Sequence, residues 1–173
     1  YLVKEPKVSV DKPPLLILLH GVGSNEKDLF SFATYLPDKF LVISARAPIV
    51  LGPSSFGWYQ VDFSCGKPIY NQEQERKSRE MILTFIEELK ELHPFDENEV
   101  YLMGFSQGAI MSYSIALTHP EKIKAIGILS GRLLEEIKPF VNAGQVNKLN
   151  IFISHGIQDP VLPIAYAEDA VSY

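Results

Sequence analysis

Aliphatic runs of strand length alternate with helical patterns along the chain. Five of these runs are continuously apolar rather than alternating, which is typical of strands that are buried on both faces of a parallel sheet. They cover residues 15–20, 40–44, 100–104, 125–129 and 150–154. A weaker pattern predicts a further strand at 7–10, and the proline-, glycine- and serine-rich stretch 48–57 is interpreted as a loop.

Helical spacing occupies the segments between the apolar runs. The clearest helix covers 72–93, where Asn71 can cap its start and Pro94 ends it. A second helix, 107–118, is apolar on almost every side and is expected to be the buried helix of the fold. Strands that alternate with helices predict an α/β fold, with a mostly parallel central sheet covered by helices on both faces.

A G-x-S-x-G pattern lies where the strand at 100–104 meets the buried helix. A strand–turn–helix context is typical of the nucleophile elbow, in which a tight turn lifts a serine hydroxyl clear of the sheet. We therefore predict that Ser106 is a catalytic nucleophile. The alternative is that Ser106 only caps the helix that follows it.

A nucleophilic serine needs hydrogen-bond donors for the negative charge that develops on the attacked carbonyl oxygen. The backbone N–H of Gln107, directly after the serine, is one candidate. The loop 20–25 follows a strand and contains two glycines, so the N–H of Val22 is assigned as the second donor. An ordinary turn capped by Asn25 is the alternative. Glu26 stands where a dinucleotide-binding loop requires its third glycine, so no nicotinamide cofactor is expected.

A carboxylate follows the serine at the end of another expected strand. Asp159 lies in the loop after 150–154, and open α/β sheets bind their ligands at the carboxyl ends of the strands. Its expected role is to orient a histidine and to stabilise the imidazolium form. A turn formed by Asp159 before Pro160 is the alternative.

Three motifs together resemble one known family. They are H-G-V-G-S-N from His20, G-F-S-Q-G-A from Gly104 and H-G-x-x-D-P-V-x-P from His155. In this order and at these separations they resemble the phospholipase/carboxylesterase family of α/β-hydrolases, which includes acyl-protein thioesterases and small bacterial carboxylesterases. The resemblance extends over residues 15–163.

This resemblance implies an α/β-hydrolase fold with Ser106 as nucleophile and Asp159 as the acid of a catalytic triad. It implies an oxyanion hole made by the N–H groups of Val22 and Gln107. The implied activity is hydrolysis of a small-molecule carboxylic ester, including thioesters or lysophospholipids, through an acyl-enzyme, without a metal or another cofactor.

The chain departs from the family pattern in its histidines. In the family a general-base histidine follows the acid, whereas no histidine follows Asp159 here. His20 belongs to the oxyanion loop, His93 and His119 precede prolines at helix ends, and His155 comes four residues before the acid. None of the four fits the role of general base.

Two interpretations of the missing base follow. The first is that residues 1–173 are a single α/β-hydrolase domain that lacks its C-terminal strand, histidine loop and closing helix. The absence of an initiating Met and the uncapped helical pattern at 164–173 fit cut ends, so the intact protein would be active and this chain nearly inactive. The alternative is a non-catalytic relative that binds a small acyl or lactone ligand.

Aromatic residues are concentrated in the stretch 53–70, and the resemblance implies that this stretch lies beside the nucleophile. Trp58 is predicted to line an apolar acyl pocket, and packing of Trp58 on the sheet is an equal alternative. Cys65 has no motif around it and is interpreted as a spare thiol.

Composition limits the classes of partner. With 16 Lys and Arg against 21 Asp and Glu, the formal net charge is −5, which argues against nucleic acid as a partner. The longest aliphatic run, 15–19, is far shorter than a membrane span, and the N-terminus lacks the layout of a signal peptide. A single cysteine fits a reducing compartment, so a cytoplasmic protein is expected. The resemblance also allows a homodimer.

Overall fold

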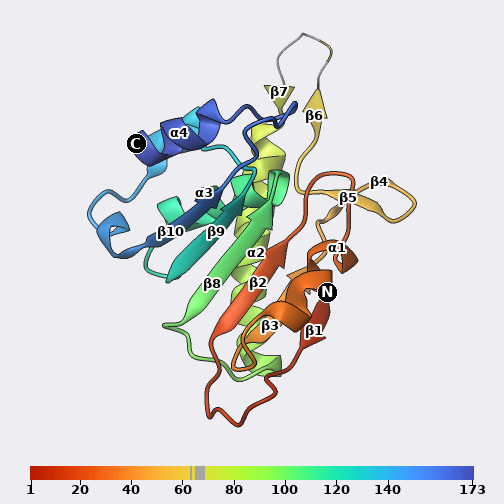
Figure 1. Cartoon of the computed structure of the whole chain (residues 1–173), viewed down its shortest axis with the longest axis vertical. Helices are drawn as coiled ribbons and strands as arrows, with labels where there is room; N and C mark the ends of the chain where they lie inside the picture. Colours follow the sequence, from red (N-terminus) through yellow and green to blue (C-terminus); the bar gives the residue numbers. More distant parts are fainter. Residues whose placement is uncertain (63, 65–68) are drawn as a thin grey trace.

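The computed structural model describes residues 1–62, 64 and 69–173, and a six-stranded sheet organises them (Figure 1). The order of the strands is β1-β3-β2-β8-β9-β10, in which β1 is antiparallel to β3 and the other pairs are parallel. The strands are β1 (Leu2–Lys4), β2 (Leu15–Leu19), β3 (Leu41–Ala45), β8 (Val100–Phe105), β9 (Ala125–Leu129) and β10 (Asn150–Ser154). The five strands expected from the continuous apolar runs are therefore confirmed, but β10 is largely exposed at the edge of the sheet instead of buried on both faces.

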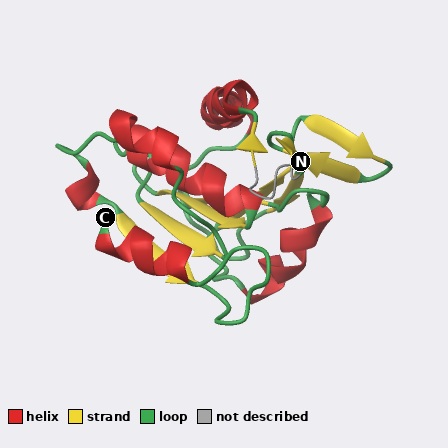
Figure 2. Cartoon of the chain, turned by 90° about the horizontal axis from the view of Figure 1, so that it is seen from above, coloured by secondary structure: helices red, strands yellow, loops and turns green. Residues whose placement is uncertain are grey.

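Helices cover both faces of the sheet (Figure 2). On one face, α2 (Gln72–Leu92) and α3 (Gln107–Thr118) contribute to the larger core, together with Leu15, Ile17 and Leu19 of β2. On the other face, α1 (Lys27–Phe30) and the 3-10 helix η1 (Ser31–Tyr35) pack against the intervening residues of β2. Successive side chains of a strand point to opposite faces, so both faces of β2 must be apolar.

The two long helices follow the expected pattern. The Asn71 side chain accepts a hydrogen bond from the N–H of Gln74 at 3.0 Å and caps α2, which ends at Leu92 before Pro94. All residues of α3 from Gln107 to Leu117 are buried. The helix expected at 164–173 is α4 (Ala165–Ser172), and two short 3-10 helices, η2 (Glu135–Phe140) and η3 (Val146–Lys148), precede β10. Among the described residues, no helix is both long and apolar enough to cross a membrane.

Two local expectations are wrong. The strand expected at 7–10 is an exposed segment, and β1 at Leu2–Lys4 pairs with β3 instead, because Pro6 has no N–H with which to extend the pairing. The stretch 48–57 contains an antiparallel hairpin of β4 (Ile49–Gly52) and β5 (Ser55–Gly57) rather than only a loop.

A second, shorter pair of strands lies between the hairpin and α2. It consists of β6 (Val61–Asp62) and β7 (Ile69–Tyr70), which are antiparallel to each other. Cys65, interpreted above as a spare thiol, lies outside the described residues, as does Phe63 of the aromatic stretch.

Candidate active site

The parallel strands bring the segments singled out in the sequence to one edge of the sheet, toward the top of Figure 1. Leu19 at the end of β2 lies opposite Gly104 of β8, and Leu129 at the end of β9 lies opposite both Phe105 of β8 and Ser154 of β10. Because these ends are in register, the loops that follow β2, β8, β9 and β10 start side by side. This edge is where open α/β sheets bind ligands.

Ser106 connects β8 to α3 in a strained backbone conformation. Its φ is +51° and its ψ is −114°, in a region that residues other than glycine rarely adopt. Its N–H donates to the carbonyl of Leu129 at 2.9 Å, and its carbonyl accepts from the N–H of Ile110 at 3.0 Å. Strain of this kind costs about 1–3 kcal/mol and persists where the surrounding structure holds it, most often at functional sites.

The two glycines of the motif allow the close approach that this turn needs. A Cβ on Gly104 would lie 2.2 Å from the carbonyl oxygen of Gly108, and a Cβ on Gly108 would lie 1.9 Å from the carbonyl oxygen of Leu19. The first turn of α3 therefore packs directly on the backbone of β8 and β2. This packing is the physical reason for glycine on both sides of the serine.

Ser106, Val22 and Gln107 border one small cavity of about 70 Å³. The N–H of Gln107 is the first of α3, so it has no acceptor within the helix. Within the described part of the chain, neither this N–H nor that of Val22 donates a hydrogen bond. The structure thus brings the expected nucleophile together with the two expected donors.

A buried histidine shapes the loop that carries Val22. The Nδ1 of His20 lies 2.7 Å from the carbonyl oxygen of Gly21, while its Nε2 accepts a hydrogen bond from the N–H of Ala47 at 3.1 Å. This pattern assigns the proton to Nδ1 of a neutral ring, and burial lowers the pKa of His20 in agreement with it. Both nitrogens of His20 are therefore occupied by backbone groups.

An ion pair that the sequence did not reveal braces the same loop. Arg46 donates two hydrogen bonds to the buried carboxylate of Glu26, at 2.6 and 2.5 Å. These bonds lower the pKa of Glu26 to about 2. The pair joins the end of the Val22 loop to the residue that follows β3.

The side chain of Gln107 has a structural role besides the N–H of its backbone. Its Oε1 accepts from the N–H of Trp58 at 2.7 Å, and its Nε2 donates to the carbonyl of Tyr59 at 2.7 Å. The Trp58 ring is buried in the core, donates from Nε1 to the carbonyl of His20 at 2.9 Å, and is not among the residues that line the Ser106 cavity. Tyr59 lines that cavity, whereas Trp58 borders a separate hollow of about 540 Å³ beside α2. The structure therefore does not bring Trp58 to the cavity of Ser106.

Asp159 is held by its own loop after β10. Its Oδ1 accepts hydrogen bonds from the N–H groups of Val161 and Leu162, both at 2.9 Å. These two bonds lower the pKa of Asp159 and keep it ionised. Asp159 itself does not line the Ser106 cavity, but Val161 and Leu162 do.

The histidines of the chain are engaged elsewhere. The Nε2 of His155 lies 2.6 Å from the carbonyl oxygen of Leu162 and 3.7 Å from Oδ2 of Asp159. His93 lies beside Glu5 and His119 beside Thr118. In the described part of the chain, no histidine ring is hydrogen-bonded to Ser106, and no group of three or more His, Cys, Asp or Glu side chains is arranged to hold a metal ion.

Comparisons with known proteins identify a family model and relatives of similar sequence. The sequence model of the phospholipase/carboxylesterase family matches residues 3–173. Acyl-protein thioesterase 1 of Kluyveromyces lactis is 28% identical over 172 residues, which cover 92% of this chain and 75% of that protein. The esterase YpfH of Escherichia coli is 29% identical over 168 residues, which cover 92% of this chain and 68% of that protein.

Solved structures show the same fold. The crystal structure of esterase PE8 superposes with a TM-score of 0.82 at 25% identity, covering 99% of this chain and 80% of that one. The Bacillus cereus carboxylesterase superposes with a TM-score of 0.79 at 24% identity, covering 99% of this chain and 76% of that one. The mostly parallel sheet with helices on both faces is therefore an α/β-hydrolase fold.

Proposed function

Because this chain belongs to the phospholipase/carboxylesterase family, we propose that it is a serine hydrolase of carboxylic esters that acts through an acyl-enzyme on Ser106. The observation that carries the proposal is the strained Ser106 at the start of α3, bordering a cavity with two N–H groups that have no acceptor within the described residues. Thioesters and lysophospholipids are the other substrates that the proposal includes, since one relative is an acyl-protein thioesterase.

In the proposed reaction, the Oγ of Ser106 attacks the ester carbonyl carbon and forms a tetrahedral intermediate. The N–H groups of Val22 and Gln107 donate to its oxyanion, and one such donor contributes about 2.7–4 kcal/mol in a comparable hydrolase. A general base takes the proton of Ser106 Oγ during the attack and gives it to the leaving alcohol or thiol as the intermediate collapses, which leaves the acyl group on Ser106. Water then hydrolyses the acyl-enzyme and regenerates the free serine.

Asp159 is proposed as the acid that orients a general-base histidine. Two backbone N–H groups hold its Oδ1, whereas its Oδ2 accepts neither of those bonds, so Oδ2 is the oxygen proposed to bind an imidazole N–H. None of the four histidines of the chain fits as the base, and the proposal takes the base from a part of the protein outside these 173 residues. The alignments support this step, because they cover only 75% and 68% of the two relatives.

A fluorophosphonate probe tests the nucleophile in the intact protein. The wild type is expected to label, and Ser106→Ala is expected to abolish labelling. Ser54→Ala is the matched control, because Ser54 also has a positive φ, +57°, but lies in the β4–β5 turn. Equal labelling of Ser106→Ala and the wild type would remove Ser106 as the nucleophile.

The non-catalytic alternative rests on the absence of a histidine after Asp159. It has less support, since the two relatives are named as a thioesterase and an esterase. Hydrolysis of p-nitrophenyl butyrate distinguishes the two functions: intact protein that binds this ester without turnover above background would favour the alternative.

Asp159→Asn is expected to reduce kcat by about 10⁴-fold, as the equivalent change does in a serine protease.

We also propose a cytoplasmic location, supported by the single cysteine of the sequence. A homodimer is a further expectation for the intact protein. Static light scattering tests it, and the mass of a monomer at working concentration would exclude it.

A further inference from the structure

Arg132 lies close to the nucleophile without having been singled out by any motif. It follows β9 three residues after Leu129, whose carbonyl accepts the 2.9 Å hydrogen bond from the N–H of Ser106. Arg132 lines the same cavity as Ser106. It is the only charged side chain among the residues that line this cavity.

No acidic group neutralises this guanidinium in the described part of the chain. No carboxylate oxygen there lies within 4.0 Å of Arg132, and its Nε is buried without a hydrogen-bond partner. The five residues outside the described part include no Asp or Glu. A buried donor without an acceptor costs free energy, so a ligand that accepts a hydrogen bond from the Nε of Arg132 would recover that cost.

Aromatic rings support Arg132 from two sides. The centre of its guanidinium lies 5.9 Å from the centroid of the Tyr70 ring and 5.5 Å from that of Tyr166. Contacts between a guanidinium and the face of an aromatic ring stabilise the positive charge without using the N–H groups of the arginine as hydrogen-bond donors. The rings therefore restrict where the guanidinium lies while its N–H groups remain available to a ligand.

Other charged groups line a second hollow beside Arg132. A second hollow of about 200 Å³ is lined by Arg132 together with Glu135, Glu136, Lys138 and Asp169. The Glu136 carboxylate is close enough to Tyr70 to help burial raise the pKa of that hydroxyl. Because Tyr70 also contacts Arg132, Glu136 is the acidic residue chosen to test competition for the guanidinium.

We propose that Arg132 determines substrate specificity by binding an anionic group, a carboxylate or a phosphate, of the ester that Ser106 attacks. This inference rests on the proposed function and names its substrate class. A guanidinium matches both anions with two parallel hydrogen bonds, and the otherwise uncharged cavity strengthens that attraction. The cavity is small beside the roughly 300–1,000 Å³ of drug-sized sites, so the anionic group lies only a few atoms from the ester carbonyl.

Two pairs of esters test the proposal in the intact protein and separate the two anions. Monomethyl adipate against methyl hexanoate places a carboxylate in the acyl part, and butyrylglycerol phosphate against butyrylglycerol places a phosphate in the alcohol part. The readout is the ratio of kcat/KM for the charged ester to kcat/KM for the neutral ester. The ratio cancels any general loss of activity in a variant.

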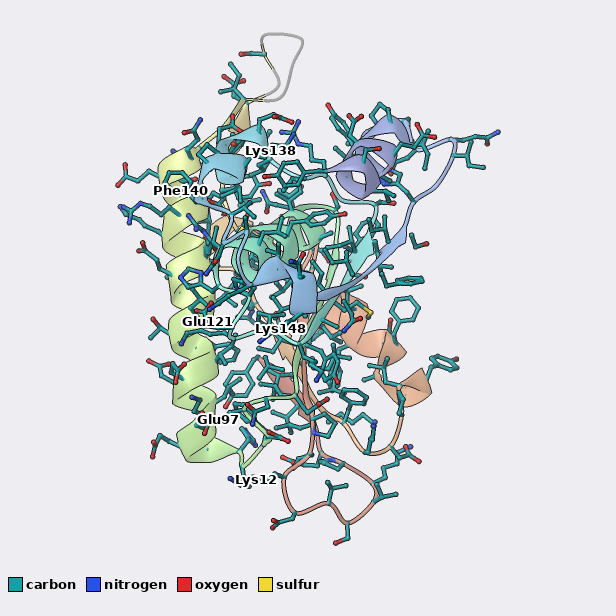
Figure 3. All side chains as sticks on the ribbon, turned by 90° about the vertical axis from the view of Figure 1, so that its left-hand side faces the viewer. Lys12, Glu97, Glu121, Lys138, Phe140 and Lys148 are labelled. Atoms are coloured by element: carbon teal, nitrogen blue, oxygen red, sulfur yellow. The ribbon has the colours of Figure 1, made fainter. Side chains whose placement is uncertain are left out.

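The wild-type ratio is expected to exceed 10 in at least one pair. Arg132→Met should lower that ratio about 10- to 100-fold, the worth of hydrogen bonds between charged groups, and Arg132→Lys should lower it less. Lys138→Met is the matched control. Lys138 lies on η2 (Figure 3) and lines the second hollow but not the Ser106 cavity, so the ratio of this variant should change less than twofold. Glu136→Gln should leave the ratio unchanged or raise it.

A ratio near 1 in both pairs, or one that Arg132→Met leaves unchanged, would overturn the proposal. If Arg132→Met does not fold, a second experiment uses the wild type and measures how well each ester protects Ser106 from the fluorophosphonate probe. The charged ester should protect at a concentration at least 10-fold lower than the neutral ester. Equal protection by the two esters would overturn the proposal. Absence of both labelling and hydrolysis would instead refute the proposed function, and the specificity inference with it. Labelling with a preference for neutral esters would refute the specificity inference alone.

Discussion

Replacement of Gly108 by alanine tests whether α3 must contact the end of β2 for Ser106 to be presented. The added Cβ would lie 1.9 Å from the carbonyl oxygen of Leu19 and 2.7 Å from that of His20. A carbon–oxygen contact normally needs about 3.3 Å, so α3 would have to move from β2 by about 1.4 Å. Because both oxygens belong to the backbone, no change of rotamer can relieve the overlap.

Two consequences of this shift can be measured. Overpacking of a well-packed core costs about 1–3 kcal/mol, and the severity of this overlap places the expected loss in the free energy of unfolding at about 3 kcal/mol. Ser106 is two residues before Gly108, so the shift also displaces the nucleophile from Val22. A displacement of about 1 Å can cost roughly 100-fold in rate.

Urea unfolding measures the first effect, and the rate of fluorophosphonate labelling per folded molecule measures the second. Gly144→Ala is the matched control, because the nearest atom to its added Cβ, Oδ1 of Asn142, would be 3.8 Å away. It should change the free energy of unfolding by less than about 0.5 kcal/mol. Wild-type stability and a wild-type labelling rate in Gly108→Ala would refute the close-packing argument.

Two further predictions concern the supports of the site. The pKa of Glu26, about 2 beside Arg46 against an ordinary 4.5, means that its ion pair contributes fully above about pH 4.5 and is lost as the pH falls toward 2. When the pH falls from 5 to 3, the free energy of unfolding, measured with urea, should decrease by about 1 kcal/mol more in the wild type than in Glu26→Gln. The difference is no larger because the half-exposed Arg46 weakens the ion pair, and equal decreases in the two proteins would contradict the prediction. Gln107→Met leaves the N–H of Trp58 and the carbonyl of Tyr59 unpaired and should cost about 2–4 kcal/mol in the same assay, whereas a loss below about 0.5 kcal/mol would show that these bonds contribute little.

The continuous apolar runs predicted the parallel strands almost to the residue. This holds for β2 and β3, which are buried at every position, and equally for β10, which is largely exposed, so the run of apolar residues rather than the degree of burial located these strands. The β4–β5 hairpin escaped prediction because its strands are only four and three residues long, lie in a proline-, glycine- and serine-rich stretch and carry no periodic signal. For β1, pairing with the free edge of β3 decided the position, and a single three-residue strand has too few residues to show a period.

The turn at Ser106 was predictable because its cause is local: two glycines are required at fixed offsets by the backbone itself. The supports of the site are not local. Glu26 and Arg46 are 20 residues apart, and Gln107 and Trp58 are 49 residues apart. Polar pairs at such separations have no spacing rule, so only the fold reveals them. Arg132 could be predicted even less, because it stands out only by having no acidic partner within the described residues, and no sequence motif indicates a missing partner.

The sequence could not predict which of two adjacent aromatic residues, Trp58 or Tyr59, lines the cavity of Ser106. Trp58 and Tyr59 are both buried in the core, but only Tyr59 also lines the Ser106 cavity, whereas Trp58 borders a separate hollow beside α2. The sequence offered both rings and no means of choosing between them. The amide of Gln107 makes the choice, because it binds the N–H of Trp58 and the carbonyl of Tyr59 and so holds both residues in one orientation. Since Gln107 is also the first residue of α3, the helix that carries Ser106 also holds in place the aromatic ring of Tyr59 that lines the Ser106 cavity.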